Sequence, residues 1–352
     1  MSRTSLALFG AGAIGRTHID RITRSADLAL VGVADPTDGG KALAQGLNVP
    51  WFASHLDLLD AMKPQGAIVA TPNALHIEQA LDCLKRGVPV LVEKPVADTV
   101  AEAQLLVGAQ ASTGVPVLVG HHRRYNPINR RAQRIVQDGK LGQLVSANVM
   151  ATFFKPQAYF DAAPWRTVQG GGPILINLIH EIDMLRFICG EIVEVQAIGS
   201  NAVRGFAVED TAAAVCRFAN GALGTLVLSD TATSPWCWDM CAGEQGQYPR
   251  QNVQSHFISG THGSLSLPDL ALWDYRGERS WHAELTVEQA RVHQQDPYTL
   301  QLQHLAAVIA GTETPICSAL DGLRTLQATL AVSEAAQTGR AVQIAIDKKG
   351  PI

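Results

Sequence analysis

The chain has 352 residues, of which 47% are apolar and 17% are charged, and its formal net charge is −4. This length favours two domains, and the small negative charge gives no reason to expect nucleic acid or an anionic membrane as a partner. No apolar stretch approaches the roughly 18 residues of a membrane-spanning helix, and the N-terminus does not resemble a signal peptide. We therefore expect a cytoplasmic protein that binds neither nucleic acid nor membranes.

Residues 6 to about 120 alternate short apolar runs with amphipathic segments, such as His76–Arg86 and Thr99–Ser112. This alternation is typical of βαβ units and predicts a parallel sheet, so residues 1–122 are expected to form a dinucleotide-binding Rossmann domain. The expected strands are Leu6–Phe9, Ala29–Ala34, Gly66–Ala70, Val88–Val92 and Val115–Val119.

A glycine-rich turn follows the first expected strand and reads Gly10-Ala11-Gly12-Ala13-Ile14-Gly15. In a dinucleotide site the first glycine allows a tight turn, the second lets the pyrophosphate approach the backbone, and the third lets helix and strand pack closely. The helix after this turn and an acidic residue at the end of the second strand strengthen the interpretation. We expect Gly10, Gly12, Ala13, Ile14 and Gly15 to bind the cofactor; a glycine turn without a ligand is the alternative.

Asp35 is that acidic residue, twenty positions after Gly15. Its carboxylate can accept hydrogen bonds from the ribose hydroxyls of the adenosine and would repel a 2′-phosphate. No Arg or Lys follows until Lys41. The sequence therefore predicts NAD in preference to NADP.

Two further turns follow expected strands of the same sheet, Ala70-Thr71-Pro72-Asn73 and Glu93-Lys94-Pro95. Ligands of open parallel sheets bind outside the carboxyl ends of the strands, and Lys94 is suited there to proton transfer beside the nicotinamide. We expect six residues to contact the cofactor: Thr71, Pro72, Asn73, His76, Glu93 and Lys94. The alternatives are a plain turn in which Asn73 caps the next helix, and a surface lysine at a strand end.

Residues 123–352 are expected to form a second α/β domain, which binds the substrate and mediates oligomerisation. No regular helix separates its later strands, so the sheet should be large and mostly antiparallel. A helix beginning near Pro173 carries His180 and Asp183, with Ile176 on the same face by α-helical spacing. The expected strands are Leu144–Thr152, Val193–Ala202, Asp210–Phe218, Ala222–Ser229, Gln254–Gly260 and Ser264–Leu267.

The scattered cysteines provide no metal site. The chain has six, and only Cys237 and Cys241 lie close together, without a second pair or a histidine cluster. Reduced thiols and no bound metal are the expectation.

With these motifs the chain resembles the Gfo/Idh/MocA family of oxidoreductases over essentially its whole length. The matching segments are Gly10–Gly15, Asp35, Ala70–Asn73, Glu93-Lys94-Pro95, Gly170-Gly171-Gly172 with His180-Glu181-Ile182-Asp183, Gly260–Leu265 and Thr338–Val342. The resemblance implies a Rossmann domain followed by an α/β domain whose open sheet often forms a subunit interface. It also implies a cis peptide before Pro95 that aims Lys94 at the substrate.

One position departs from the family pattern. An aspartate that orients the histidine usually stands four residues before it, where this chain has Ile176. The neighbouring Asn177 lies about 100° around an α-helix, and its amide cannot act as an acid or base. This leaves Lys94 and His180 as the expected catalytic residues. His180 can alternatively be a buried histidine bonded to backbone, and Asp183 is interpreted as structural.

Aromatic and basic side chains supply the expected substrate contacts, because aromatic faces pack on sugar rings and arginine binds carboxylates. A subunit-contact loop would use the same residue types and is the alternative. The expected substrate-binding residues are Lys94, His122, Arg123, Tyr159, Trp165, Arg166, Asn177, His180, Trp236 and Tyr248.

The predicted function is NAD-dependent oxidation of a secondary alcohol in a sugar-, sugar-acid- or cyclitol-like molecule, with Lys94 receiving the hydroxyl proton. NAD-dependent glycoside cleavage through transient oxidation and non-catalytic NAD-responsive binding are the alternatives. We expect a homodimer or homotetramer formed through the C-terminal sheet. The sequence does not name the substrate or its stereochemistry.

Overall fold

The computed structural model describes residues 3–346, and contacts divide the chain into two compact units. Unit 1 comprises residues up to Tyr125 together with Gln295–Leu326, and unit 2 comprises Asn126–Gln294 together with the residues from Gln327 onward. The sequence predicted that the chain passes from the first domain to the second only once, after residue 122. The difference arises because helix α10 (Pro297–Ile309) inserts Leu302, Leu305 and Val308 into the core of the Rossmann sheet.

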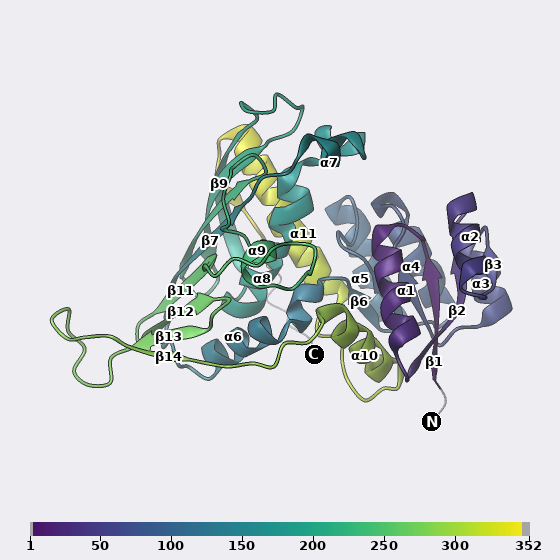
Figure 1. Cartoon of the computed structure of the whole chain (residues 1–352), viewed down its shortest axis with the longest axis horizontal. Helices are drawn as coiled ribbons and strands as arrows, with labels where there is room; N and C mark the ends of the chain where they lie inside the picture. Colours follow the sequence, from purple (N-terminus) through teal and green to yellow (C-terminus); the bar gives the residue numbers. More distant parts are fainter. Residues whose placement is uncertain (1–2, 347–352) are drawn as a thin grey trace. The chain divides into compact units, whose positions relative to one another are not determined.

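Unit 1 contains the predicted parallel sheet, in the strand order β3-β2-β1-β4-β5-β6 (Figure 1). Its strands are β1 (Thr4–Phe9), β2 (Leu28–Ala34), β3 (Trp51–Phe52), β4 (Gly66–Val69), β5 (Val90–Val92) and β6 (Val117–Val119). Strands β4 and β5 and the edge strand β6 are buried at every position, as expected for a sheet covered on both faces. The two-residue β3 is too short for a sequence pattern to indicate it.

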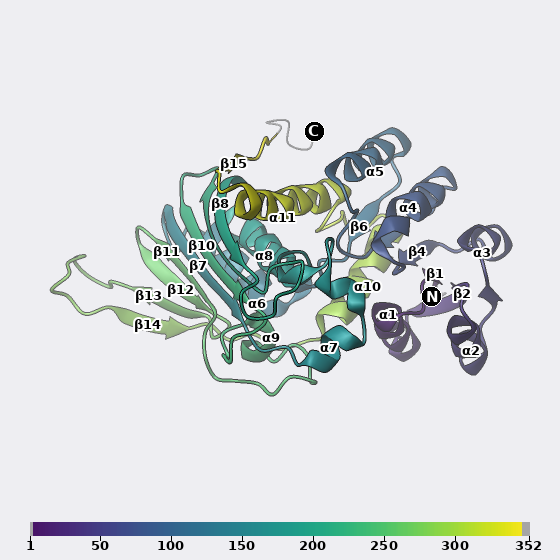
Figure 2. The ribbon, with the colours of Figure 1, turned by 90° about the horizontal axis from the view of Figure 1, so that it is seen from above.

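Helices cover both faces of this sheet, with α4 and α5 on one side and α1 on the other (Figure 2). Several begin at residues that satisfy their first N–H groups; Thr99, for example, forms a capping box with Glu102 at the start of α5. The remaining helical segments of unit 1 are α1 (Ala13–Arg24), α2 (Asp38–Gly46), α3 (His55–Met62), α4 (His76–Lys85), α5 (Val100–Thr113) and the 3₁₀ turns Asn73–Leu75 and His122–Tyr125.

Unit 2 contains a nine-stranded sheet in the order β14-β13-β12-β11-β7-β10-β9-β8-β15. Strand β7 pairs with β10 in parallel, and the other described pairings of this sheet are antiparallel. The strands are β7 (Leu144–Thr152), β8 (Ile192–Ser200), β9 (Thr211–Phe218), β10 (Leu223–Ser229), β11 (His256–Gly260), β12 (Gly263–Leu267), β13 (Ala271–Asp274), β14 (Thr286–Gln289) and β15 (Val342–Gln343). The last three were not predicted, because each has at most four residues.

The helices of unit 2 lie mainly on one face of its sheet, where α6, α8 and α11 are seen in Figure 2. The opposite face exposes a row of side chains at one register level: Phe257, Asn148, Thr225, Val215 and Gln196. The helical segments are α6 (Pro127–Gln137), α7 (Gln157–Asp161), the 3₁₀ turn Pro164–Thr167, the π turn Ile174–Leu178, α8 (Ile179–Cys189), α9 (Trp238–Cys241) and α11 (Ala319–Thr338), whose first residues belong to unit 1.

Neither a membrane span nor a metal cluster is found in the part of the chain that the structure describes. None of its helices is both long and apolar enough to cross a membrane. No group of three His, Cys, Asp or Glu side chains is placed there to hold a metal ion.

Candidate active site

The glycine turn between β1 and α1 is fixed by close backbone contacts. Gly10 has φ +91°, and a Cβ added to it would lie 2.5 Å from the carbonyl oxygen of Ala70. A Cβ on Gly15 would lie 2.1 Å from the carbonyl oxygen of Gly10. Both positions therefore require glycine for the reasons that the motif predicted.

Gly12 differs from these two glycines because it faces open space. A Cβ added there would have no protein atom within 4 Å, and its φ of −68° suits any residue. Gly12 precedes α1, whose first turn contains no acidic residue and has no side-chain cap. Free N–H groups and a positive helix end fit the pyrophosphate of a dinucleotide.

Asp35 ends just beyond β2 and is held toward the glycine turn. Its Oδ2 accepts a hydrogen bond of 2.7 Å from the backbone N–H of Ala11, and its Oδ1 accepts from the N–H and hydroxyl of Thr37 at 2.9 and 2.5 Å. Burial alone would raise the pKa of Asp35, but these hydrogen bonds outweigh it and lower the pKa. The ionised carboxylate retains acceptor capacity for the ribose hydroxyls of NAD.

The turn after β4 is closed by its own side chains. Thr71 donates its hydroxyl hydrogen to Gln79 Oε1 at 2.8 Å. The two ring nitrogens of His76 lie 2.8 Å from the Pro95 carbonyl oxygen and 2.9 Å from that of Thr71. His76 thus links the turns after β4 and β5. Asn73 lies in a 3₁₀ turn, and α4 has Leu75 at its N-cap without a side-chain cap, so the capping alternative for Asn73 is wrong.

The Glu93-Lys94 turn follows β5 and has the cis peptide before Pro95 that the family resemblance implied. Glu93 is buried, and its Oε1 lies 2.7 Å from Nε2 of His18 on α1. Burial alone would raise the pKa of Glu93, but the interaction with His18 outweighs it and lowers the pKa. The Glu93 side chain also accepts a hydrogen bond of 3.3 Å from the N–H of Lys94, so a buried carboxylate supports the backbone of the lysine.

The sequence did not single out two aromatic residues near this turn, His18, which contacts Glu93, and Tyr298, which contacts His18. Tyr298, on α10, stacks on His122 with ring centroids 4.3 Å apart and contacts His18 edge-on at 5.8 Å. His122 and Arg123 are 4% and 3% exposed, respectively. His18 lies on α1 outside any motif, and Tyr298 is distant in sequence, so only the fold brings His18 to Glu93 and Tyr298 to His18.

In unit 2 a π turn, Ile174–Leu178, precedes α8 and carries Asn177. A π turn closes with i→i+5 hydrogen bonds, so the 3.6-residue spacing that placed Ile176 on the face of His180 does not apply through it. Asn177 Oδ1 accepts a hydrogen bond of 2.5 Å from Nζ of Lys155, which follows β7. Sequence analysis missed Lys155; a lysine directly after a strand-like apolar run was its only signal.

Two cationic side chains contact the ring of Tyr159. The Lys155 Nζ is 4.8 Å and the Arg166 Cζ is 3.8 Å from the centroid of its ring. The guanidinium of Arg166 also donates to the carbonyl oxygen of Tyr159 and lies 5.7 Å from the ring of Trp165, which is 53% exposed. Burial raises the pKa of Tyr159, which keeps its hydroxyl protonated.

The other predicted substrate residues of unit 2, Trp236 and Tyr248, both keep exposed surface, unlike the neighbouring Trp238. Trp236 is 44% exposed, and Tyr248 is half-buried with its pKa raised, mainly by burial. Trp238 is fully buried, and its indole N–H donates to Glu244 Oε2 at 3.1 Å. Trp236 and Tyr248 thus stay accessible, while Trp238 anchors the segment between them.

His180 and Asp183 lie on α8, where their environments differ. His180 is half-buried, whereas Asp183 is 1% exposed and lies 3.9 Å from the guanidinium of Arg186. This burial supports the interpretation of Asp183 as structural. Lys94 belongs to unit 1 and His180 to unit 2.

Comparison with known proteins identifies the class of this protein. Residues 4–121 match the model of the oxidoreductase family with an NAD-binding Rossmann fold (GFO_IDH_MocA), and residues 129–266 match the GFO/IDH/MocA C-terminal domain. The chain therefore belongs to the Gfo/Idh/MocA family, as its motifs predicted.

Named relatives extend this result. The chain is 27% identical to scyllo-inositol 2-dehydrogenase (NAD(+)) of Bacillus subtilis over 97% of this chain and 96% of the relative. It is 26% identical to the rhizopine catabolism protein MocA of Rhizobium meliloti, over 70% of this chain and 78% of the relative. The WlbA dehydrogenase of Bordetella pertussis, solved with NADH and UDP-GlcNAcA, shares the fold with a TM-score of 0.80 at 23% identity, covering 98% of this chain and 100% of that one. The protein is an NAD-dependent dehydrogenase that acts on CH–OH groups.

Proposed function

We propose that this dehydrogenase oxidises a secondary alcohol of a sugar-like, sugar-acid or cyclitol substrate, with Lys94 as the group that receives the hydroxyl proton. The observation that carries the proposal is the order of strands in unit 1. Strands β1, β4 and β5 are neighbours, so the glycine turn, the Thr71 turn and Lys94 follow adjacent carboxyl ends of one sheet. Ligands of such sheets bind at these ends.

The reaction divides between hydride and proton transfer. NAD⁺, held at Gly10–Gly15 and Asp35, would supply the acceptor for the hydride of the substrate carbon. Lys94, in its neutral form, takes the proton from the hydroxyl, so that the C–O bond becomes a carbonyl. The buried Glu93 and His18 hold the backbone of Lys94. We assign His180 to alignment of the same hydroxyl.

The accessible residues of unit 2 suit recognition of the rest of the substrate. Tyr159, Trp165, Trp236 and Tyr248 offer aromatic surface, while Arg166 and Asn177 offer polar groups (Trp165 and Trp236 being the most exposed). His122 stacks on Tyr298 and lies near enough to Glu93 to help lower the pKa of that carboxyl, which favours a supporting role for His122 over direct substrate contact.

A screen with NAD tests this function, using sugars, sugar acids, cyclitols and dihydrodiols and following NADH by its absorbance. Net NADH formation with an alcohol is the expected result. Cleavage of an aryl glycoside without accumulation of NADH would favour the glycosidase alternative. Tight NAD binding without turnover of any polyol would favour a binding protein, an alternative kept open by Ile176 in place of the usual aspartate.

We also propose that the cytoplasmic enzyme is a homodimer or homotetramer formed through the open face of the unit 2 sheet. This face exposes large apolar side chains, among them Ile198 (77%), Val215 (50%) and Phe257 (42%). Large apolar side chains exposed on one face of a sheet are typical of interfaces. Sedimentation of the V215E variant should show smaller particles than wild type if the face is an interface, and unchanged particles if it is not.

A further inference from the structure

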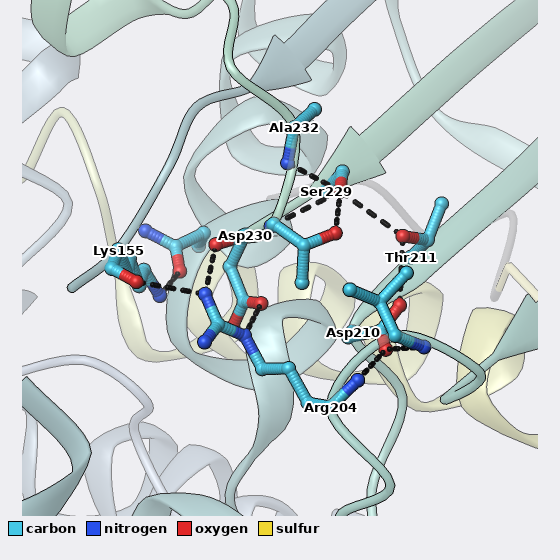
Figure 3. A network of polar contacts seen from close by, with 10 residues as sticks. Lys155, Arg204, Asp210, Thr211, Ser229, Asp230 and Ala232 are labelled. Carbon is cyan, nitrogen blue, oxygen red and sulfur yellow. Dashed lines mark hydrogen bonds and ion pairs between the residues drawn. The ribbon is translucent and has the colours of Figure 1, made fainter. Parts of the chain in front are cut away.

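Lys155 is a buried lysine whose main chain is held firmly. It is 5% exposed, its N–H donates to the Asp230 carbonyl oxygen at 2.9 Å, and its own carbonyl oxygen accepts from Arg204 at 2.8 Å. Arg204 Nε also donates to Asp230 Oδ1 at 2.8 Å (Figure 3). The Asp230 carboxylate is therefore paired with Arg204, and the same network fixes the start of the Lys155 side chain.

The ammonium group of Lys155 has few partners. It carries three N–H donors, and Asn177 Oδ1 accepts one of them at 2.5 Å. The face of the Tyr159 ring adds a cation–π contact. Among residues 3–346 no carboxylate forms an ion pair with this group. The Phe153 ring centroid also lies 5.5 Å from this group. A neutral amide and two ring faces compensate only part of the cost of burying a charge.

Arg166 is a second cation at the same ring and likewise has no ion-pair partner among the described residues. It contacts the face of Tyr159, and its Nε is buried without a hydrogen-bond partner. Two cations therefore contact one tyrosine, and each has N–H groups that no described residue accepts. Such a cluster is costly in the free protein and becomes favourable when an anion satisfies both cations.

The electrostatics of Lys155 agree with this geometry. The pKa of Lys155 is lowered to about 8, mainly by burial and also by Arg166 and Arg204, while Asp230 and Asp239 oppose the change. Near neutral pH the group is still mostly a cation, but one that is poorly compensated.

We propose that Lys155 and Arg166 together bind a carboxylate of the substrate, so that the enzyme acts on a sugar acid or cyclitol acid in preference to a neutral polyol. This inference rests on the proposed oxidation of a polyol and specifies its substrate class. A carboxylate carries one negative charge, which two cations can balance. A dianionic phosphate would be repelled more strongly by the nearby Asp230 and Asp239.

Kinetics on matched substrate pairs tests the subsite. We would compare D-glucuronate with D-glucose and D-galacturonate with D-galactose, using NAD and the K155M, R166Q and K140M variants. Lys140 is exposed and serves as the control. Wild type and K140M should prefer an acid in kcat/KM, and K155M should reduce that preference roughly 10- to 100-fold. Equal kcat/KM for acid and neutral partners in wild type, or an unchanged preference in K155M, would overturn the proposal.

Calorimetric titration of the same four compounds into the NADH-loaded enzyme gives a readout that does not need turnover. If no compound is oxidised but an acid binds wild type and not K155M, the proposed oxidation fails for these compounds while the carboxylate subsite stands. If neither acid binds wild type, or if glucose 6-phosphate binds more tightly than both acids, the subsite proposal is wrong.

The thermal stability of K155M separates a functional charge from a structural one. Replacing the buried ammonium with methionine should raise the Tm, because it removes the cost of burying a charge that has no ion-pair partner. Functional sites often carry groups that destabilise the fold in this way. The folded-state pKa is depressed, so this gain should be fully present below pH 8 and should shrink as the pH rises above it. A Tm below that of wild type at neutral pH would show that the protein already compensates the ammonium, which contradicts the proposal.

Discussion

The cofactor end of unit 1 and the cation cluster of unit 2 differ in how the protein compensates buried charge. Asp35 and Glu93 are buried carboxylates that interact with hydrogen-bond donors of the protein, Ala11 and Thr37 for Asp35 and His18 for Glu93. Lys155 and Arg166 are cations that face an aromatic ring and an amide instead of carboxylates.

The glycine turn of unit 1 therefore has a fixed geometry of its own, whereas the cation cluster of unit 2 is suited to binding an anion. The glycine turn depends on backbone contacts that admit no side chain, so its shape exists before a ligand binds. The cation cluster reaches its lowest free energy only with an anion present. Substitutions at the first region should therefore change folding or NAD binding, whereas substitutions at the second should change which substrate is used.

The largest expected effect comes from a pair of alanine substitutions in the glycine turn. A Cβ on Gly15 would collide with the Gly10 carbonyl, whereas one on Gly12 would meet only open space. G15A should lower the unfolding free energy by about 1–3 kcal/mol or more, because backbone must move. G12A should leave the Tm unchanged and weaken NAD binding. Thermal unfolding and NAD titration of both variants measure this, and equal Tm losses in the two would contradict the assigned roles.

The I176D variant tests whether the missing aspartate can simply be restored. Ile176 is half-buried on the π turn, so a carboxylate there would be poorly solvated. We expect at least a tenfold loss of kcat/KM, by the roughly 1–3 kcal/mol cost of such burial, and a smaller loss in the neutral I176L control. Activity at or above that of wild type would show instead that the site still accepts the usual aspartate, so that the surroundings of Ile176 have not adapted to an apolar side chain.

Asp35 should affect cofactor choice more modestly. Loss of charge-assisted hydrogen bonds to the ribose should weaken NAD binding roughly tenfold or more in D35A and narrow the difference between NAD and NADP. D57A, which removes an exposed carboxylate from α3, is the matched control. Titration of both cofactors into the apo protein measures the effect, and NADP binding at least as tightly as NAD in wild type would refute the assignment.

The geometry of the glycine turn was predicted well because its signals are local. A strand, three glycines and an acidic residue at fixed spacing describe Gly10–Gly15 and Asp35, and close backbone contacts explain Gly10 and Gly15. The cation cluster was predicted only in part, since Tyr159, Arg166 and Asn177 were named and Lys155 was not. Its contact with Asn177 depends on a π turn, which no hydrophobic period indicates. Likewise, α10 brings Tyr298 beside His122 from a segment that the sequence assigned to the other domain.

The most direct test of the account is the rate of the K94A variant on the substrate found by the NAD screen. Removal of a positioned acid or base typically costs about 10²- to 10⁴-fold in rate. We predict a loss of kcat of that order with NAD affinity nearly unchanged, because Glu93 and the glycine turn remain in place. A kcat close to that of wild type would contradict proton transfer by Lys94.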